Sequence, residues 1–448
     1  MTDAISLPAT EETTAVQPKQ VASGRSLFAL AFGYLIDQGE GQAMSVLFPT
    51  LQTLWGLSYS QLGVIGTIRN ILQSVTAPFW GYLSDRYSRK YVIMVGTGIW
   101  GIWTLLIGFT TNFGQLLTLR AISGIGLGCL MPAVFSLISD MYPPQKRGQA
   151  LGILSAIGVL GAIIFTIALG FLATPDLWRW GFFMLGGLSV LSGLLVWWLV
   201  DEPVRGQGEP ELEGKLDAST AELFRVKLSD VPKLLSIPTI WVAIGQGLAG
   251  SMPWVVLGLY FITWLVRTHD MDETMASIIF AAIVVGTAIS NVFGGYLGDF
   301  AERKSVRFGR PLVGLISVLS GIPLTYLLFT YSQNWSIPFI IGFSFFTALF
   351  ISWAGSGAKA PMMQNVTPPE MRASAYAFVA FIESGFAALA AYFAGRLADS
   401  IGITQAMLWM VPFPWIICAL IFSLFFITYP RDYAKLRAEM AYRAEGLS

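Results

Sequence analysis

The chain alternates between long apolar runs and short polar segments over most of its length. Twelve of these runs are long enough to supply the roughly 20 residues that a helix needs to cross a ~30 Å hydrocarbon core. The pattern therefore predicts an all-α membrane protein with twelve transmembrane helices. They begin near Leu27, Gln61, Tyr91, Gln115, Gly148, Gly181, Thr239, Thr274, Leu312, Ile337, Arg372 and Ile403.

Two similar charged stretches divide this pattern into halves. "GYLSDRYSRK" at 81–90 and "GYLGDFAERK" at 295–304 share six of ten residues, with an offset of 295 − 81 = 214. A second pair, "PPQKRGQA" and "PPEMRASA", recurs with the offset 368 − 143 = 225. Parallel repeats of this kind are typical of transporters that rock two halves around a central site. We expect a tail at 1–25, a six-helix bundle at 26–200, a polar linker at 201–236, a second bundle at 237–430 and a tail at 431–448.

The charge distribution predicts the orientation of the helices. Hydrophobic residues make up 54% of the 448 residues and charged residues only 12%, with a formal net charge of zero. When both termini are placed in the cytoplasm of a cell-membrane protein, 21 of the 27 Lys and Arg residues lie inside, three outside and three within spans. This bias follows the positive-inside rule. The N-terminal segment lacks the apolar core of a signal peptide, and the balanced charge gives no indication of a nucleic-acid partner.

Charged residues inside the spans are the candidates for chemistry, because each costs about 2.5–3.5 kcal/mol on insertion scales. We expect proton coupling at carboxylates that a desolvated site can protonate and deprotonate: Asp37, Glu40 and Glu383. We expect substrate contacts from Arg69, Arg120, Asn70, Gln246 and Asn291. The alternatives are a salt bridge that only specifies packing, for example Asp37 with Arg120, and amides that only bond neighbouring helices. Lys359 is expected to snorkel to water.

Motifs for enzymatic chemistry are missing from the sequence. The chain has one histidine, so an H-E-x-x-H zinc site cannot form, and no Walker-type phosphate-binding run is present. We therefore predict no catalytic residue, no metal and no cofactor.

At the two charged stretches the chain resembles the major facilitator superfamily, whose loop between helices two and three reads G-x-x-x-D-R-x-x-R-K. The matching residues are Gly81, Asp85, Arg86, Arg89 and Lys90, with Gly295, Asp299, Arg303 and Lys304 in the second copy. The family pattern R-x-x-x-G-x-G appears as Arg120, Gly124 and Gly126. A narrower likeness, to the spinster branch of lysophospholipid and sphingoid-lipid carriers, rests on "YLIDQGEGQAMSVLFPTLQ", "WRW" and "EPVRGQGE". That branch commonly carries Glu after the G-x-G, where this chain has Leu127.

The resemblance suggests a gating role for these loop residues. Asp85 ends helix two, and "TPPEMR" opens helix eleven with free N–H groups that attract a carboxylate. We expect Asp85 to clasp that helix start, Arg89 to meet Asp140, and Asp299 to repeat the clasp against the helix that follows Pro144. The simpler alternative is a solvated loop that only sets topology.

Together these observations predict a monomeric secondary carrier that works by alternating access in a lipid bilayer. Its coupling ion is expected to be H⁺ rather than Na⁺, and its substrate a small amphipathic or anionic organic solute, with a lysolipid or sphingoid-like lipid included. A drug or multidrug carrier and a sugar-acid carrier are alternatives within the same class. A receptor or scaffold that keeps the fold without transport is the alternative from another class.

Overall fold

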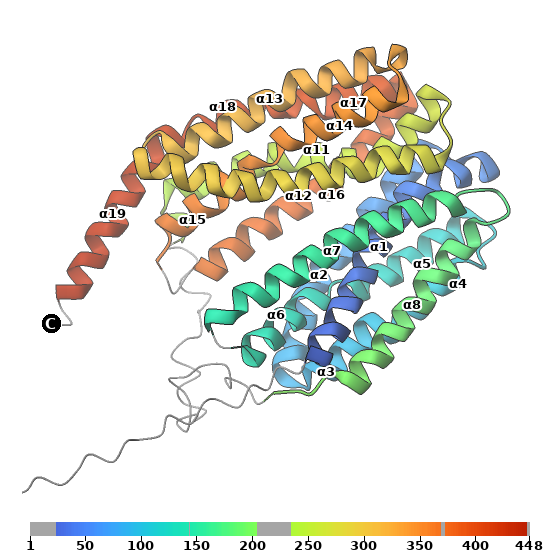
Figure 1. Cartoon of the computed structure of the whole chain (residues 1–448), viewed down its shortest axis with the longest axis horizontal. Helices are drawn as coiled ribbons and strands as arrows, with labels where there is room; N and C mark the ends of the chain where they lie inside the picture. The colour runs from blue at the N-terminus through green and yellow to red at the C-terminus, as the bar shows by residue number, and fades with distance from the viewer. Residues whose placement is uncertain (1–23, 143, 204–233, 369–371, 446–448) are drawn as a thin grey trace, which may run out of the picture.

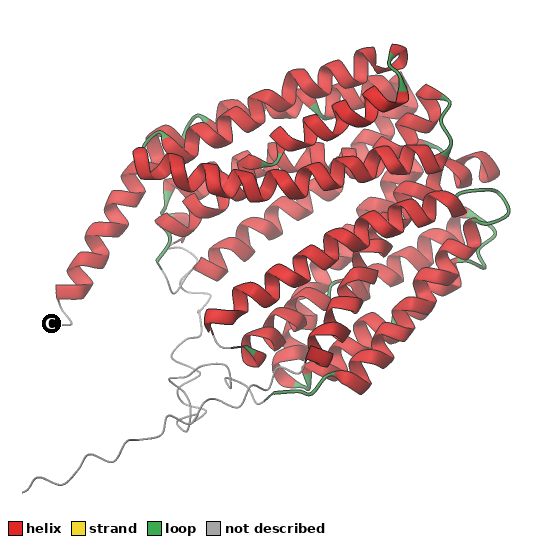
Figure 2. Ribbon diagram, viewed as in Figure 1, coloured by secondary structure: helices red, strands yellow, loops and turns green. Residues whose placement is uncertain are grey.

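The computed structural model describes residues 24–142, 144–203, 234–368 and 372–445. Within these ranges the chain is helical and contains no strand (Figure 2). The predicted all-α fold is confirmed. Most of the predicted N-terminal tail and linker, including the amphipathic end of the linker, lies outside the described residues.

The first bundle contains six spans, two of which are interrupted. The third span is formed by α3, the π-helical turn η1 and α4, and the fourth by α5 and α6. The elements are α1 (Gly24–Trp55), α2 (Tyr59–Arg86), α3 (Arg89–Ile93), η1 (Met94–Ile99), α4 (Gly101–Ile107), α5 (Phe113–Leu127), α6 (Leu130–Met141), α7 (Pro144–Leu172) and α8 (Trp178–Leu199).

The second bundle repeats this arrangement with six further spans. Here the tenth span is formed by α14, the π-helical turn η5 and α15, and the twelfth by α17 and α18, after which α19 follows. The elements are α11 (Pro238–His269), α12 (Glu273–Lys304), α13 (Gly309–Tyr331), η4 (Ser332–Asn334), α14 (Ile337–Ile351), η5 (Ala354–Lys359), α15 (Ala360–Val366), α16 (Arg372–Ile401), α17 (Ile403–Met410), α18 (Pro412–Phe422) and α19 (Phe425–Glu445).

Short polar residues start several of these helices. Ser58 and Gln61 form a capping box at α2, in which the Ser58 hydroxyl accepts from the Gln61 N–H and the Gln61 side chain accepts from the Ser58 N–H. Asn112 caps α5, and Asp272 caps α12 by accepting from the Met275 N–H at 2.7 Å. Each cap satisfies donors that a helix start leaves unpaired.

The helices suit a membrane environment. Among the described residues, nine segments are long and apolar enough to cross a bilayer. The remaining three spans are α1, α2 and the pair α5–α6. The hydropathy of α1 and α2 is lowered by polar residues in their interior, which include Asp37, Glu40, Arg69 and Asn70. The pair α5–α6 is interrupted at Gly128. The protein is therefore a multi-pass membrane protein, and its least apolar spans carry the predicted site residues of the first bundle.

The two bundles meet at one end of the molecule, which we call the closed end; it is the end at which α1 stops and α2 begins. Figure 1 shows the ribbons of the bundles converging there and diverging toward the opposite end, the linker end. Hydrogen bonds join the bundles at the closed end. Arg267 of α11 donates to the Pro49 carbonyl at 3.0 Å and to the Thr53 hydroxyl at 2.8 Å, and Asp399 of α16 accepts from the Tyr59 and Ser60 N–H groups at 2.7 and 2.9 Å.

Candidate functional site

The first bundle gathers four charged side chains around α1. Arg120 of α5 is 1% exposed and Glu40 is 4% exposed, and an Nη1–Oε1 distance of 3.4 Å joins them. The Thr104 hydroxyl of α4 donates to the same Glu40 oxygen at 2.6 Å. Asp37, one turn earlier on α1, lies within electrostatic reach of Glu40 and Arg69. Two acids and two bases therefore share one buried, charge-balanced cluster.

The pairing inside this cluster differs from the example given by sequence reasoning. Arg120 contacts Glu40 and not Asp37 among its described partners, since its Nη2 also donates to the Glu40 carbonyl at 3.5 Å. The spacing of Asp37 and Glu40 places both on one face of α1, so the spacing could not decide which of them faces α5. In the structure Glu40 faces Arg120 of α5 and Thr104 of α4.

Arg69 and Asn70 border the same cluster from α2. Arg69 Nη1 donates to Asn70 Oδ1 at 3.4 Å, and the buried Arg69 Nε has no hydrogen-bond partner among the described residues. The backbone of Arg69 packs against Gly124, where an added Cβ would lie 3.0 Å from the Arg69 carbonyl oxygen. Gly124 of the R-x-x-x-G-x-G pattern therefore lets α5 approach α2 closely and brings the charges of Arg69 and Arg120 together.

A cavity of only about 20 Å³ lies beside the cluster. Asp37, Glu40, Thr104 and several serines line it. Leu127 also lines it, at the position where the spinster branch commonly carries Glu. The space is about that of one water molecule.

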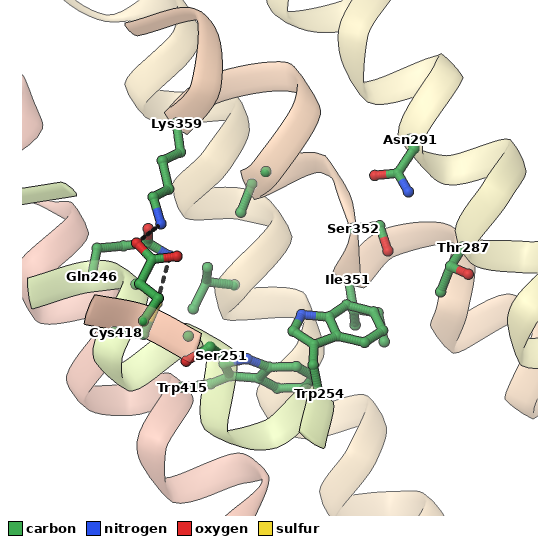
Figure 3. Close-up of a pocket in the computed structure, with 16 residues that line it drawn as sticks. Gln246, Ser251, Trp254, Thr287, Asn291, Ile351, Ser352, Lys359, Trp415 and Cys418 are labelled. Atoms are coloured by element: carbon green, nitrogen blue, oxygen red, sulfur yellow. Dashed lines mark hydrogen bonds and ion pairs between the residues drawn. The ribbon is translucent and has the colours of Figure 1, made fainter. Parts of the chain in front are cut away.

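The second bundle holds a much larger cavity, of about 440 Å³ (Figure 3). Gln246 of α11 and Asn291 of α12, both predicted substrate contacts, line it. Glu383 of α16 also lines it and forms an ion pair with Lys359 at the end of η5. The structure thus brings three predicted residues together with a lysine to which the sequence analysis gave no functional role.

Lys359 does not reach water in the way that the sequence predicted. Its side chain is 14% exposed and is held by Glu383 Oε1 inside the bundle. The π-helical turn Ala354–Lys359 accounts for this placement, because an extra residue in a turn rotates the following side chains by about 100° relative to a regular helix. The sequence signal in this turn is Gly357, where an added Cβ would lie 2.3 Å from the Gly294 carbonyl oxygen, so that a glycine is needed for η5 to pack closely on α12.

Two tryptophans complete the wall of this cavity. Trp254 of α11 and Trp415 of α18 lie edge to face, with ring centroids 6.3 Å apart. Thr287 and Asn291 of α12 lie on the opposite side of Trp254 from Lys359 (Figure 3). The cavity therefore has a charged side, an aromatic middle and a neutral polar side.

The first copy of the charged repeat is organised around Arg89. This side chain is 1% exposed, and its backbone N–H donates to Glu202 Oε1 at 2.7 Å while its Nη2 donates to the Pro203 carbonyl at 3.0 Å. The side chains of Asp85 and Asp140 lie outside the described residues, as does Glu370 at the start of helix eleven. Arg86 donates to the Tyr82 hydroxyl at 2.8 Å, and Gly81 faces open space.

The second copy is organised around a residue beyond the repeat. Arg310 of α13 is 6% exposed; its Nε donates to Glu302 Oε2 at 2.5 Å, its Nη1 donates to the Gly357 carbonyl at 3.0 Å, and its Nη2 pairs with Asp299. Asp299 was expected to clasp the helix after Pro144, but its described partner belongs to its own bundle. Arg303 and Lys304 are exposed, and Gly295 faces open space.

Neither a metal site nor a histidine-based centre is found in the described part of the chain. No group of three or more His, Cys, Asp or Glu side chains is placed there to hold a metal ion. His269 contacts the hydroxyls of Thr268 and Ser332 at 2.8 and 2.9 Å, near the closed end.

Comparisons with known proteins give a consistent assignment. The family model described as Major Facilitator Superfamily matches residues 30–265 and 242–445. The "Probable 4-methylmuconolactone transporter" of Cupriavidus pinatubonensis is 25% identical over 394 residues, 86% of each chain. Protein spinster of Drosophila melanogaster is 25% identical over 399 residues, 87% of this chain and 65% of that protein. A crystal structure of a bacterial homolog of spinster, inward-facing and unoccupied, superposes with a TM-score of 0.80 at 20% identity, over 91% of this chain and 98% of that one.

Proposed function

The chain belongs to the major facilitator superfamily of membrane transporters, and from this premise we propose that it couples proton movement to the transport of a small organic anion or amphipathic solute. Transport by alternating access follows from the two-bundle arrangement, in which a site between or within the bundles is exposed to one side at a time. The similarity to a spinster protein and to a 4-methylmuconolactone transporter is consistent with both lipid-like and organic-acid substrates.

The observation that carries the proposal is the set of paired charges inside the spans. Glu40 with Arg120 and Glu383 with Lys359 sit on different bundles; the first pair is buried, and the second is part-buried beside the large cavity. Charges in the membrane are costly, and a receptor or scaffold could bear the same fold with apolar residues at these positions. Paired charges that must separate and re-form give a transporter a means of linking two binding events.

We assign proton binding to the cluster in the first bundle. A carboxylate that loses its counter-ion in a poorly hydrated site favours the protonated form, so release of Glu40 by Arg120 would be accompanied by proton uptake. Asp37, beside Glu40 and Arg69, is the first of the two acids to consider, because Glu40 is paired with Arg120 in this conformation. Binding of H⁺ rather than Na⁺ suits this site, since a cavity of about 20 Å³ leaves little room for a hydrated ion.

The substrate contacts are proposed on both bundles. Gln246 and Asn291 line the large cavity and offer neutral polar contacts. Arg69 has a buried, unpartnered Nε among the described residues, and Asn70 lies next to it. A role for Arg120 in holding a substrate anion requires that Glu40 first release the guanidinium, so proton and substrate binding would be linked at this residue.

The orientation of the chain is proposed from its charges. If the positive-inside rule holds, the linker end and both termini are cytoplasmic, and the closed end faces outward. The conformation described above is then inward-facing. An impermeant thiol reagent should label a cysteine placed at position 269 but not one at position 215 in intact cells that carry a variant without Cys129 and Cys418; the reverse result would overturn the orientation.

The gating role of the charged repeats is likewise proposed. Asp85 and Asp140, with Arg86, Arg89 and Lys90, would close the linker end against the start of α16 when the closed end opens. Asp299, Arg303 and Lys304 would act in the same way on α7. A carboxylate bound to a helix start already occurs at the closed end, where Asp399 accepts from two N–H groups at the start of α2.

Uptake into proteoliposomes tests the proposal. Purified protein would be assayed with an imposed pH gradient and a panel of simple carboxylates, sugar acids, lysolipids and drugs. We expect gradient-driven accumulation of at least one anionic or amphipathic member of the panel. Binding of a member without any accumulation, in protein shown to be folded, would favour the receptor alternative instead.

A further inference from the structure

The cavity of the second bundle has the dimensions of a ligand pocket. Its volume of about 440 Å³ falls within the range of about 300–1,000 Å³ typical of small-molecule sites. Its lining residues all belong to the second bundle and come from α11, α12, α13, α14, η5, α16 and α18 and from Ser352 between α14 and η5. A solute held there would move with this bundle during transport.

The lysine on the charged side of the cavity already has an ion-pair partner. Lys359 pairs with Glu383 Oε1, and both side chains border the cavity. The pair fits only because residue 247 is a glycine, since a Cβ added there would overlap both Glu383 and Lys359. The carboxylate of Glu383 thus sits where the carboxylate of a solute would bind the ammonium group.

A second polar group on this side lacks a partner. Gln246 is 6% exposed, and its Nε2 donates to Cys418 Sγ at 3.3 Å. Its Oε1 is buried and has no hydrogen-bond partner among the described residues. An unpaired buried amide oxygen is costly, and because the two ends of the amide are interchangeable by a flip, the side chain can offer either a donor or an acceptor to a ligand.

The remaining walls define the shape of the ligand. In Figure 3, Lys359 lies on one side of the cavity and Asn291 and Thr287 on the other, and Trp254 lies below the space between them. Trp415 packs against the Trp254 ring. Flat indole walls favour a ring over a flexible chain, because aromatic groups stack or meet edge to face. The amide and hydroxyl of α12 favour a polar substituent at the end of the ring opposite the acid.

We propose that this cavity binds a ring carboxylate with a polar group at its far end, and that Glu383 is an internal counter-ion which the ligand carboxylate displaces from Lys359. This inference rests on the proposed function and names its substrate class. One negative charge is preferred over two, because Glu383 stays in the cavity after the ligand displaces it from Lys359 and repels every further negative charge. A phosphate dianion would meet about twice the repulsion that a carboxylate meets.

Binding measurements on the full-length protein in detergent test this proposal without requiring transport. Isothermal titration would compare 4-hydroxybenzoate with 4-hydroxybenzamide, which keeps the ring and the hydroxyl but lacks the charge. We expect the acid to bind the wild-type protein at least tenfold more tightly than the amide. Glu383→Gln should tighten binding of the acid several-fold because the competing carboxylate is gone, and Lys359→Met should weaken it at least tenfold. Lys435→Met, at an exposed lysine of α19, is the matched control and should change nothing.

A double variant covers the case in which Lys359→Met fails to fold with Glu383 left unpaired. Lys359→Met combined with Glu383→Gln is neutral at both positions and should bind the acid and the amide equally. The proposal is overturned if the wild-type protein binds neither compound, if the double variant still prefers the acid, or if Glu383→Gln weakens the acid. Any of these results would leave proteoliposome uptake free to confirm or refute the transport function separately.

Discussion

The two copies of the charged repeat have similar sequences but different structures. In the first copy, Arg89 is buried and binds Glu202 and the Pro203 carbonyl beyond the last helix of its bundle. In the second copy, the aligned Arg303 is exposed, and Arg310, seven residues later, is the buried arginine. A repeat in the sequence therefore preserves the location of a charged cluster without preserving the residue at its centre.

The residues between the charges explain this difference. In the first copy, α2 ends at Arg86 and Ser88 caps a new helix, so Arg89 takes the first position of α3 and turns inward. In the second copy, Ala301 and Glu302 stand at the positions of Tyr87 and Ser88; both favour helix, and α12 continues to Lys304. Arg303 therefore lies on the surface of α12. The next buried arginine in the sequence is Arg310, on α13.

The largest effect that would test this comparison is on stability. Arg310→Met should lower the free energy of unfolding by about 2–4 kcal/mol, because it removes a buried guanidinium and leaves part-buried Glu302 without its cationic partner. Arg303→Met should change it by no more than about 0.5 kcal/mol, as expected of an exposed residue. Denaturant titration of the purified variants measures both. If Arg303→Met lowered the free energy of unfolding more than Arg310→Met, alignment with Arg89 and not burial would determine which arginine stabilises the second copy.

A double-mutant cycle would extend the comparison to the centre of the first bundle. Glu40→Ala and Arg120→Ala should each destabilise the protein, and the double variant should lose less than their sum, with a coupling energy of about 0.5–3 kcal/mol. Asp37→Ala with Arg120→Ala serves as the control pair and should be closer to additive. Stronger coupling to Asp37 would contradict the pairing described for Arg120.

Proton coupling would distinguish the two bundles by function. With one proton moved per cycle, a gradient of one pH unit supports about tenfold accumulation of solute. Asp37→Asn should abolish this accumulation and leave solute exchange without a gradient intact, because the amide keeps the shape but cannot titrate. Glu383→Gln should keep gradient-driven accumulation. The opposite result in proteoliposomes would move the proton site to the second bundle.

The smallest expected effects concern the two ends of the α2–α16 pair. Asp399→Asn should favour opening of the closed end by about 0.3–1 kcal/mol, because it weakens the interaction of a carboxylate with a helix start. Asp85→Asn is the matched variant. It should shift the equilibrium between the two conformations in the opposite direction, toward the one in which the linker end is open. Spin labels at Leu54 and Ile401, both exposed near the closed end, report the separation of the bundles there. If the distance between the spin labels changed equally and in the same direction in both variants, Asp399 and Asp85 could not be stabilising opposite ends of the molecule.

Much of the fold could be predicted because it depends on long apolar runs. The expected starts at Ile337, Arg372 and Ile403 coincide with the first residues of α14, α16 and α17. The pairing of charges could not be predicted. Glu40 and Asp37 occupy the same helix face, and the choice between them depends on how closely α1 packs on its neighbours. Lys359 reaches Glu383 through a π-helical turn, whose extra residue leaves no periodic trace in the sequence.

The contact of α19 with α11 constrains the order in which the chain can complete its structure during synthesis. The start of α11 has no capping side chain of its own, and Asp432 supplies one by accepting from the Thr239 N–H at 2.8 Å and the Thr239 hydroxyl at 2.6 Å. These residues are 193 positions apart. At a translation rate of about 5–20 residues per second, the seventh span waits about ten seconds or more for its cap. Its first turn is finished only after Asp432 has been synthesised.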